Sequence, residues 1–599
     1  MSTPGSTPSS LPPLDLPLPL PFPLPALLSF ALSNPFTQSL TTSAANRFFV
    51  DSHPPPSPSP SSSAGAGPGA REPFVQVREG GEDVRGCWGL LPGEWREWFD
   101  AVSPTEDGRM GVLKDLANGS REDFPPSLQA YLNSCRALSL DRSCSWDPVL
   151  SYPPRPSSSS PSSPAAPPPA NEPQEREKAK AKGKGKAEGK RKKERVQGVK
   201  GPNVKNALKA GQSDKKEHEV RQLSRLVQDL KAESPLTHCI DVGSGRAHLS
   251  RALSCPPLNL HTLALDWSSS QAAGAAKLDA IRTKADLGPT EGSLTHEVES
   301  LDEEGVRSAM GRWPPPPASP REGEEVERPP PALLVALHAC GDLTPSSLRA
   351  FVRADVEDPS RRTGAGARAV FVGCCYNMMD PGGWPMSRLV GEACSSSLSS
   401  SSSSSPAPAP LPPRITLSHL RLTPQSPPTW HLSPSSTSSF LASTLKIAFR
   451  ARLEAELAAA GVGAEDERRV GRVAECGSWG EYRRKGLSKY DYGREDLSEG
   501  EKVPELRFGA REGQEEEEWQ RALWQLRVFW TLRSWLGPVM ETLCVVDRFA
   551  FLCEGLRHEW EAEEGGQEEE KKQKKRRVEV VNVFDQATGS LRNLALVVR

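Results

Sequence analysis

Apolar runs of strand length, each followed by a polar or glycine-containing turn, recur through the second half of the chain. They lie at residues 237–242, 263–265, 332–337 and 368–372. Continuous apolar runs of this kind are typical of parallel strands that are covered on both faces. Ahead of the first run, apolar residues recur at helical spacing from about Ser213 onward. The pattern predicts an α/β fold with a doubly wound, mostly parallel sheet.

The C-terminal part of the chain continues this pattern. A helix is expected over residues 517–536, and the next apolar run, 542–548, has the length of a strand. Two further strands are expected at 578–584 and 594–598. We expect the sheet to finish there in an antiparallel edge.

Composition separates the 599 residues into folded and unfolded parts. The chain holds 59 Pro, 48 Gly and long serine tracts, and segments rich in these residues cannot bury enough apolar surface to fold. We expect residues 1–86 to be a disordered Pro/Ser-rich N-terminus and 87–153 to be a small, mostly helical region with an aromatic core. Residues 154–212 are then a linker, and 213–599 form the α/β domain.

Low-complexity segments are expected to interrupt this domain as surface insertions, because buried backbone without hydrogen-bond partners would be costly. They lie near 313–331, 394–413, 512–518 and 561–577.

The cysteines and the charged tracts bear on the compartment and the partners. The 12 cysteines follow no regular spacing, which favours reduced thiols and therefore the cytoplasm or the nucleus. The apolar stretch 11–36 is broken by many prolines and lacks a basic start, so we expect neither a membrane span nor a signal peptide. The basic run Lys190–Lys193 is either a solvated tract or a signal for nuclear import or for binding RNA or a ribonucleoprotein.

One turn carries the most specific chemistry. The segment Asp241–Gly245 follows the first apolar run, and Asp266 ends the second. In open α/β sheets, glycines beyond a strand end let a ligand approach the backbone, and an acid about 20 residues later accepts hydrogen bonds from ribose hydroxyls. A dinucleotide fingerprint requires a third glycine where this chain has His248, and the Gly-Lys-Ser/Thr of a phosphate-binding loop is absent. The D-x-G-x-G form resembles the S-adenosylmethionine turn of Rossmann-like methyltransferases.

Five short blocks stand in order along residues 210–599. They are Lys215–Val220, Asp241–Ser250, Leu337–Asp342, Val372–Tyr376 and Val583–Asp585. Together with the Leu-Pro-x-Glu-Trp that begins at Leu91, these blocks resemble the methyltransferase-like protein 25 family, which is also called the ribosomal RNA adenine dimethylase domain-containing family. The resemblance implies a Rossmann-like methyltransferase domain that uses S-adenosylmethionine. We expect cofactor contacts from Asp241, Gly243, Ser244, Gly245, Asp266, Trp267 and His338.

The family name does not assign an acceptor. Adenine N-methyltransferases commonly carry an Asn/Asp-Pro-Pro-Phe/Tyr element after the fourth strand, and here that position reads His338-Ala-Cys-Gly-Asp342. The prolines and the stacking aromatic are both missing. Adenine dimethylation of ribosomal RNA is therefore weakly supported.

Asp342 and Tyr376 are the candidates for the acceptor side of the site. Methyl transfer from a sulfonium depends on in-line positioning of the nucleophile more than on a strong base. We expect Tyr376 to be the main positioning group because a phenol can stack and hydrogen-bond at once, while Asp342 can orient or deprotonate an acceptor. Either residue can instead be structural, since an acid after a glycine often caps the next helix. Ser250 and Arg251 are expected to be solvated on the first turns of a helix.

Four potential metal ligands follow two of the expected strands. His338, Cys340, Cys374 and Cys375 would converge if both strands end at the same edge, and thiolates with imidazole suit zinc. Adjacent cysteines, however, point in different directions along an extended chain, and buried free cysteine commonly behaves as a small hydrophobe. We therefore expect no metal site. His218 either packs against the sheet or lines the cofactor mouth.

The sequence predicts an S-adenosylmethionine-dependent methyltransferase, with RNA or protein favoured over a metabolite as the acceptor. The alternative is a catalytically silent methyltransferase fold that serves as a scaffold and binds RNA or a ribonucleoprotein through the Lys/Arg-rich tracts. A nicotinamide-dependent oxidoreductase is disfavoured by His248 at the position of the third glycine.

Overall fold

The computed structural model describes residues 18–42, 48–49, 86–154, 211–284, 291–313, 332–357, 367–396, 413–459, 472–474, 476–490, 515–557, 576–586 and 590–599. The basic run Lys190–Lys193 lies outside these residues, as do nearly all of the four expected insertions. The exceptions include residues 394–396, which end helix α12 (Arg388–Ser396), residues 515–518, which begin helix α16 (Glu515–Ser534), and residues 576–577. The expectation of a surface insertion is wrong at Cys394 and Arg576, because both are buried.

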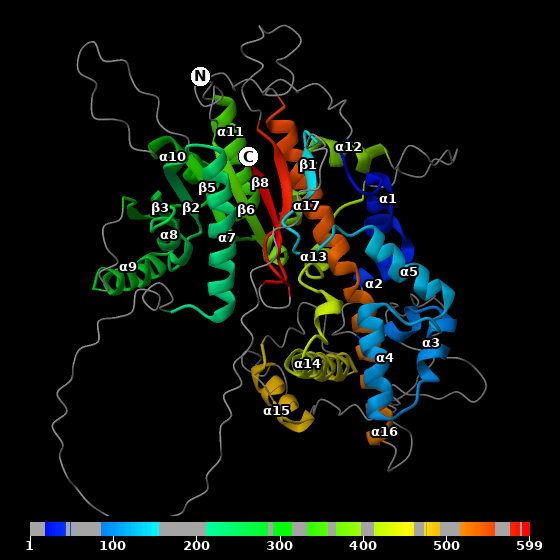
Figure 1. Ribbon diagram of the computed structural model, residues 1–599. Helices are drawn as coiled ribbons and strands as arrows, with labels where there is room; N and C mark the ends of the chain where they lie inside the picture. Colours follow the sequence, from blue (N-terminus) through cyan, green and yellow to red (C-terminus); the bar gives the residue numbers. More distant parts are fainter. Residues whose placement is uncertain are drawn as a thin grey trace, which may run out of the picture.

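A mixed sheet of eight strands organises the described residues, in the order β1-β7-β8-β6-β5-β2-β3-β4 (Figure 1). The five neighbouring strands β6, β5, β2, β3 and β4 pair in parallel. Strand β8 is antiparallel to β6 and β7, and β1 is antiparallel to β7. This arrangement confirms the predicted α/β sheet and its antiparallel edge. The strands are β1 (Pro148–Tyr152), β2 (His238–Val242), β3 (His261–Asp266), β4 (Leu294–Val298), β5 (Ala332–Cys340), β6 (Arg368–Cys374), β7 (Val578–Asn582) and β8 (Leu594–Val598).

Alternate residues of the central strands face opposite helical layers. Cys239, Leu333 and Val335 share a core with α7 (Asp214–Glu233) and α8 (His248–Leu253). Ile240 and Leu334 belong instead to the core that contains residues of α10 (Glu303–Arg312), α11 (Leu343–Glu357) and α17 (Leu536–Gly555). Successive side chains of a strand point to opposite faces, so a sheet covered on both sides needs continuous apolar runs.

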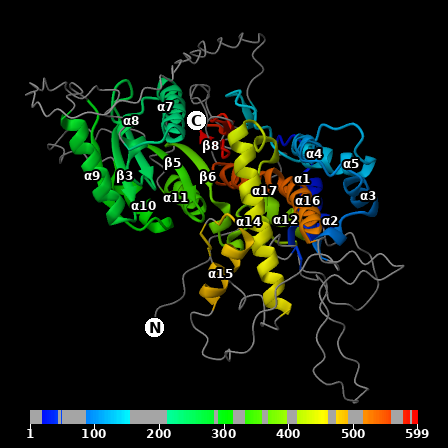
Figure 2. The ribbon, with the colours of Figure 1, turned by 90° about the horizontal axis from the view of Figure 1, so that it is seen from below.

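A helical layer packs beside the sheet. Helix α17 lies between the sheet and the N-terminal helices, and α16 lies between the N-terminal helices and α14 (Pro434–Ala459) (Figures 1 and 2). The N-terminal helices are α1 (Leu24–Leu28), α2 (Pro35–Thr42), α3 (Gly93–Asp100), α4 (Glu106–Asn118) and α5 (Pro126–Ala137), with a π-helical turn at Ser29–Ser33 and a 3-10 turn at Cys87–Leu90. The remaining helices are α9 (Ser269–Lys284), α12 (Arg388–Ser396), α13 (Leu417–Leu420), α14 (Pro434–Ala459) and α15 (Trp479–Tyr490).

The expectation that residues 1–86 are disordered is wrong for the segment 24–42. This segment is helical, and Leu27, Leu28 and Leu40 are fully buried. Arg533 of α16 donates hydrogen bonds from Nε to the carbonyl oxygen of Leu40 (2.7 Å) and from a terminal nitrogen to that of Thr41 (2.9 Å). The prolines sit at helix starts, where the missing amide costs nothing, and tertiary packing supplies the stability that the short helices lack.

The strand expected at 542–548 is also wrong, because these residues belong to helix α17. Nearly the whole surface of α17 is buried between the sheet and the N-terminal helices. A helix covered on all sides is apolar on all sides, and its short segments cannot be told from a buried strand by periodicity. Among the described residues, no helix is both long enough and apolar enough to cross a membrane.

Candidate functional site

The glycine turn lies at the carboxyl end of β2, where the sequence places it. Gly243 and Gly245 adopt φ values of 71° and 55°, which side chains disfavour. A Cβ at Gly243 would lie 2.9 Å from Cδ2 of Leu343, whereas a Cβ at Gly245 would meet no other atom within 4 Å. The amides of Gly243 and Ser244 donate to the carbonyl oxygen of Leu265 at 2.9 and 3.0 Å. The turn is thus held over the end of β3, with open space at Gly245.

Asp266 and the glycine turn meet at one sheet edge. Oδ2 of Asp266 accepts a hydrogen bond from the amide of Gly245 at 2.7 Å, and Oδ1 accepts one from the amide of Ser268 at 2.9 Å. The next side chain, Trp267, is 74% exposed. A bare indole beside a carboxylate and an open glycine turn suits a ligand that has a flat ring and hydroxyl groups, and adenosine has both. These residues therefore fit the adenosine part of S-adenosylmethionine.

Asp241 and Ser250 form a buried pair behind the turn. Oγ of Ser250 donates to Oδ2 of Asp241 at 2.5 Å, and both residues are buried. Burial raises the pKa of Asp241 to about 6, although the Ser250 hydrogen bond and the charge of Lys216 act in the opposite direction. The expectation that Ser250 and Arg251 are solvated is wrong. Arg251 is 4% exposed, and its Nε lies 2.5 Å from Oδ1 of Asp279.

The start of α7 brings charged groups to the same edge. Oε2 of Glu219 lies 2.7 Å from Nε2 of His338, and Nζ of Lys215 and of Lys216 each lie 3.9 Å from a Glu219 oxygen. Burial opposes ionisation of Glu219, but the His338 hydrogen bond and the two lysines outweigh it and lower the pKa. Burial lowers the pKa of Lys216, against the attraction of Glu219 and Asp241. Sequence reasoning did not assign Lys216 and Glu219 to the site, although both lie in the block Lys215–Val220.

His338 points toward α7 because β5 is irregular there. Its φ is 64°, and the pairing of β5 with β6 shifts between Leu337 and Ala339. An extra residue in a strand re-aims a side chain in this way. The imidazole therefore contacts Glu219. His218 is half-buried, and its Nε2 has no hydrogen-bond partner among the described residues.

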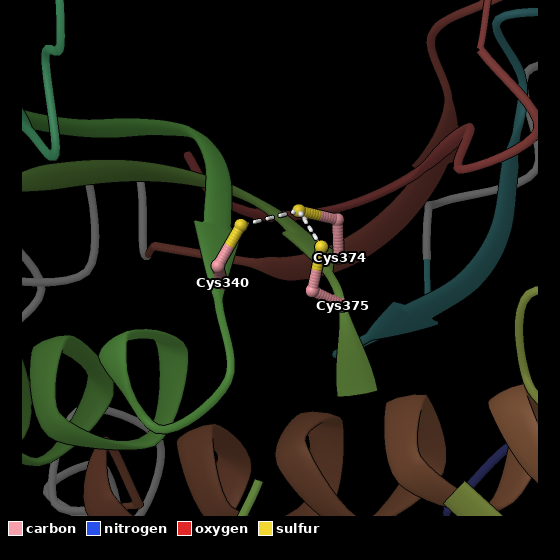
Figure 3. A group of neighbouring side chains, drawn as sticks. All are labelled: Cys340, Cys374 and Cys375. Atoms are coloured by element: carbon pink, nitrogen blue, oxygen red, sulfur yellow. Dashed lines mark hydrogen bonds between the residues drawn. The ribbon is translucent and has the colours of Figure 1, made fainter. Parts of the chain in front are cut away.

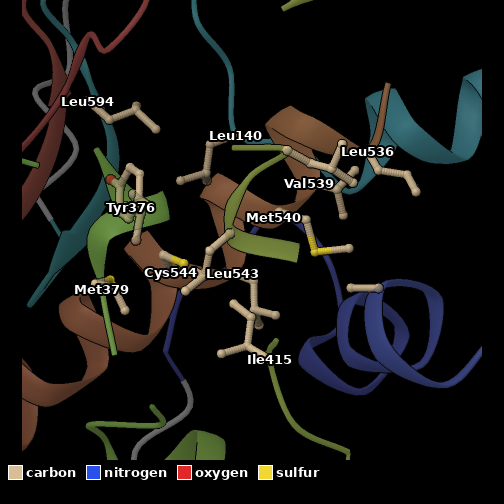
Figure 4. Close-up of a cluster of buried hydrophobic side chains, with 14 of the residues drawn as sticks. Leu140, Tyr376, Met379, Ile415, Leu536, Val539, Met540, Leu543, Cys544 and Leu594 are labelled. Carbon is tan, nitrogen blue, oxygen red and sulfur yellow. The ribbon is translucent and has the colours of Figure 1, made fainter. Parts of the chain in front are cut away.

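Tyr376 lies inside the core, which does not fit the expected contact with an acceptor. It is 1% exposed, and the guanidinium carbon of Arg548 lies 4.7 Å from its ring centroid. Figure 4 shows the ring among buried side chains that include Met379 and Cys544. Burial raises the pKa of the phenol. No local sequence pattern indicates that helix α17 covers this position.

Asp342 is exposed at the start of α11. Its two carboxylate oxygens accept from the amide of Asp380 at 3.1 and 3.2 Å. The side chain thereby ties the end of β5 to the loop after β6. This bond fits the structural role that was left open for Asp342, and the exposed carboxylate still faces solvent at the carboxyl edge of the sheet.

Three cysteines converge at the ends of β5 and β6 (Figure 3). Sγ of Cys374 lies 3.1 Å from Sγ of Cys340 and 3.7 Å from Sγ of Cys375. The hydrogen bond with Cys374 lowers the pKa of Cys340 to about 6 against the effect of burial, and the same bond raises the pKa of Cys374. Cys375 has φ 49° and ψ 43°, so the chain is no longer extended there. The premise that Cys374 and Cys375 point apart is therefore wrong.

Residues 215–381 match the model of a family described as a methyltransferase domain. The matched segment contains the glycine turn, Asp266, His338 and the three cysteines. No solved structure matches the chain. The mostly parallel sheet is typical of a methyltransferase fold, and the chain carries a methyltransferase domain over the matched residues.

Proposed function

We propose that this protein is an S-adenosylmethionine-dependent methyltransferase related to the methyltransferase-like protein 25 family. The observation that carries the proposal is the contact between Asp266 and the amide of Gly245, with Trp267 exposed beside it. It joins the two sequence elements that a nucleoside-binding turn requires. The five blocks that resemble the family support the same assignment, and four of them lie wholly inside the matched segment.

The cofactor, when bound, supplies an activated methyl group on a sulfonium. In the proposed site, Asp266 accepts hydrogen bonds from the ribose hydroxyls and Trp267 packs on the adenine ring. Gly243 and Gly245 allow the ligand to approach the backbone closely, and Ser244 and Asp241 complete the turn. His338, held by Glu219, borders the cofactor side. These residues bind and orient, which is the main requirement of methyl transfer.

On the acceptor side, Asp342 is the remaining candidate for a positioning or proton-accepting group, because Tyr376 is buried. The acceptor is proposed to be RNA or protein, and the basic tract around Lys190–Lys193 supports the RNA or ribonucleoprotein class. A nuclear or cytoplasmic location is proposed with it.

Calorimetry with S-adenosylhomocysteine tests the pocket. The full chain should bind this ligand and not NAD. Asp266→Ala should weaken binding by about 1.5–3 kcal/mol for each hydrogen bond lost, or roughly 10- to 150-fold. Trp267→Ala should weaken it by about 1–3 kcal/mol through lost stacking. Leu432→Ala removes an apolar side chain that is 59% exposed at a remote position and should change nothing. Unchanged affinity in both site variants, with the melting temperature preserved, would refute the pocket.

A second experiment separates the enzyme from the catalytically silent scaffold. Radiolabelled S-adenosylmethionine is added to fractionated cell extract with the wild-type chain or the Asp266→Ala variant, and the products are split by nuclease and protease digestion. Label that requires the wild-type chain and is released by nuclease identifies an RNA acceptor, and release by protease identifies a protein. Ligand binding without any labelled product would support the scaffold.

A further inference from the structure

We propose that Cys340, Cys374 and Cys375 form a three-thiolate site for Zn²⁺ at the carboxyl ends of β5 and β6. The three sulfur atoms all lie within 4.8 Å of one another. This inference is independent of the proposed methyl transfer, since it depends only on the cysteines and the two strands that carry them. It reverses the expectation of no metal that the linear sequence favoured.

One of the two sulfur separations from Cys374 is close to what a zinc ion requires, and the other is shorter. A Zn–S bond is about 2.3 Å, so two thiolates on a tetrahedral ion are separated by about 3.8 Å. The separations from Cys374 are 3.1 Å to Cys340 and 3.7 Å to Cys375. Small rotations of the side chains would bring all three sulfurs to the same distance from one ion.

The backbone holds the three cysteines in place. Cys340 and Cys374 are paired residues of the parallel strands β5 and β6. After Cys374 the strand ends, and the left-handed conformation of Cys375 turns its thiol toward the other two (Figure 3). A non-glycine residue in this conformation is uncommon, and such strain is often kept where a side chain has a function.

Three convergent thiols favour a metal ion over a disulfide. A disulfide would use two sulfurs, would need the pair at 3.1 Å to close to about 2.05 Å, and would leave the third thiol unused. A zinc ion would use all three and displace their protons to the solvent. The ammonium of Lys216 interacts electrostatically with Cys340 and Cys374, and a cation suits the net negative charge of three thiolates on one Zn²⁺.

The site leaves one coordination position free and has a route for entry. Cys340 and Cys375 are partly exposed, and Cys374 is buried. Among the described residues, no further His, Cys, Asp or Glu side chain joins the cluster, and the imidazole of His338 contacts Glu219 instead. Three protein ligands with an open position are the pattern of zinc sites that bind water or a substrate atom.

Metal analysis of the full-length protein tests the site. After expression in zinc-supplemented medium and purification without chelator, plasma mass spectrometry should find about one zinc ion per chain. Replacing all three cysteines by serine should abolish this zinc. The matched control is the double variant Cys144→Ser and Cys476→Ser, which removes two partly exposed cysteines outside the cluster and should keep it. Cobalt should give a thiolate charge-transfer band in wild type and control.

A readout on the unmodified chain covers the case in which the triple variant does not fold. Zinc should protect Cys340, Cys374 and Cys375 from iodoacetamide while Cys144 and Cys476 react, and a chelator should remove the protection from Cys340 and Cys375. The proposal is overturned if the wild type holds far less than one zinc ion, if the triple variant folds and retains zinc, or if peptide mapping finds a Cys340–Cys374 disulfide.

Discussion

The buried carboxyl of Asp241 is expected to make the protein less stable as the pH rises from acid toward neutral. Its pKa is raised by burial from 3.8 to about 6. The folded state therefore binds the proton more tightly than the unfolded chain does. The contribution to stability is complete below pH 3.8 and is lost as the pH rises through 6. A shift of this size corresponds to about 3 kcal/mol at pH 7.

Asp241→Asn should remove this dependence, because an amide has nearly the same shape and can still accept the Ser250 hydrogen bond. At pH 7 the variant is expected to be more stable than the wild type by up to about 3 kcal/mol, and at pH 4 the difference should largely vanish. Chemical denaturation at pH 4, 5, 6 and 7 measures it. Subtracting the stability profile of the variant from that of the wild type cancels the contributions of the other titrating groups.

Asp279 of helix α9 provides a control of opposite sign. The pKa of Asp279 is lowered, because hydrogen bonds from His296 and Arg251 outweigh the effect of burial. Its stabilisation is present above the unfolded pKa and is lost as the pH falls. Asp279→Asn should therefore destabilise the protein at pH 7. If Asp241→Asn is also destabilising at pH 7, or if its difference from wild type does not change with pH, the reasoning about Asp241 is wrong.

Two further predictions concern the helical layer. Arg533→Met should lower the free energy of unfolding by roughly 3–5 kcal/mol, since two hydrogen bonds from a charged group to the carbonyls of Leu40 and Thr41 are lost. Faster proteolysis within residues 24–42 would verify this prediction, whereas protection equal to that of the wild type would contradict it. His419 has a pKa lowered by burial to about 4, and its Nδ1 accepts from the amide of Thr416. The contribution of this group to stability should thus fall by about 3 kcal/mol as the pH drops from 6.5 to 4. His419→Asn should abolish this loss in acid denaturation, and an unchanged pH profile of the variant would refute the prediction.

The sequence was sufficient to predict the central strands of the sheet, because the patterns that identify these strands are local. The apolar runs 237–242, 263–265 and 332–337 identify buried parallel strands without knowledge of their neighbours. The spacing of Asp266 from the glycine turn places both at one edge of the sheet. The meeting of Asp266 with Gly245 followed from this topology. Short segments with weak patterns, such as β4 and β1, were not recognised, since β4 is only half-buried and β1 lies at the sheet edge.

The wrong predictions share a physical cause, which is that distant parts of the chain decide burial. Residues 542–548 have the apolar pattern of a strand, and only the packing of α17 between the sheet and the N-terminal helices makes them helical. The same helix buries Tyr376. The segment 24–42 forms only short helices that would not fold alone, but Arg533 of α16 supplies hydrogen-bond donors, and α12, α13 and α17 pack against it.

The sequence by itself thus determined the central strands of the sheet, the glycine turn and its partner Asp266, because periodicity and strand-end chemistry are properties of short segments. Only the tertiary structure decided which thiols meet. The direction of Cys375 depends on one left-handed backbone conformation, and that of His338 on an irregularity in β5. Such single-residue departures from extended geometry have no periodic signal, since they are stabilised by contacts across the fold and not by neighbours in the chain.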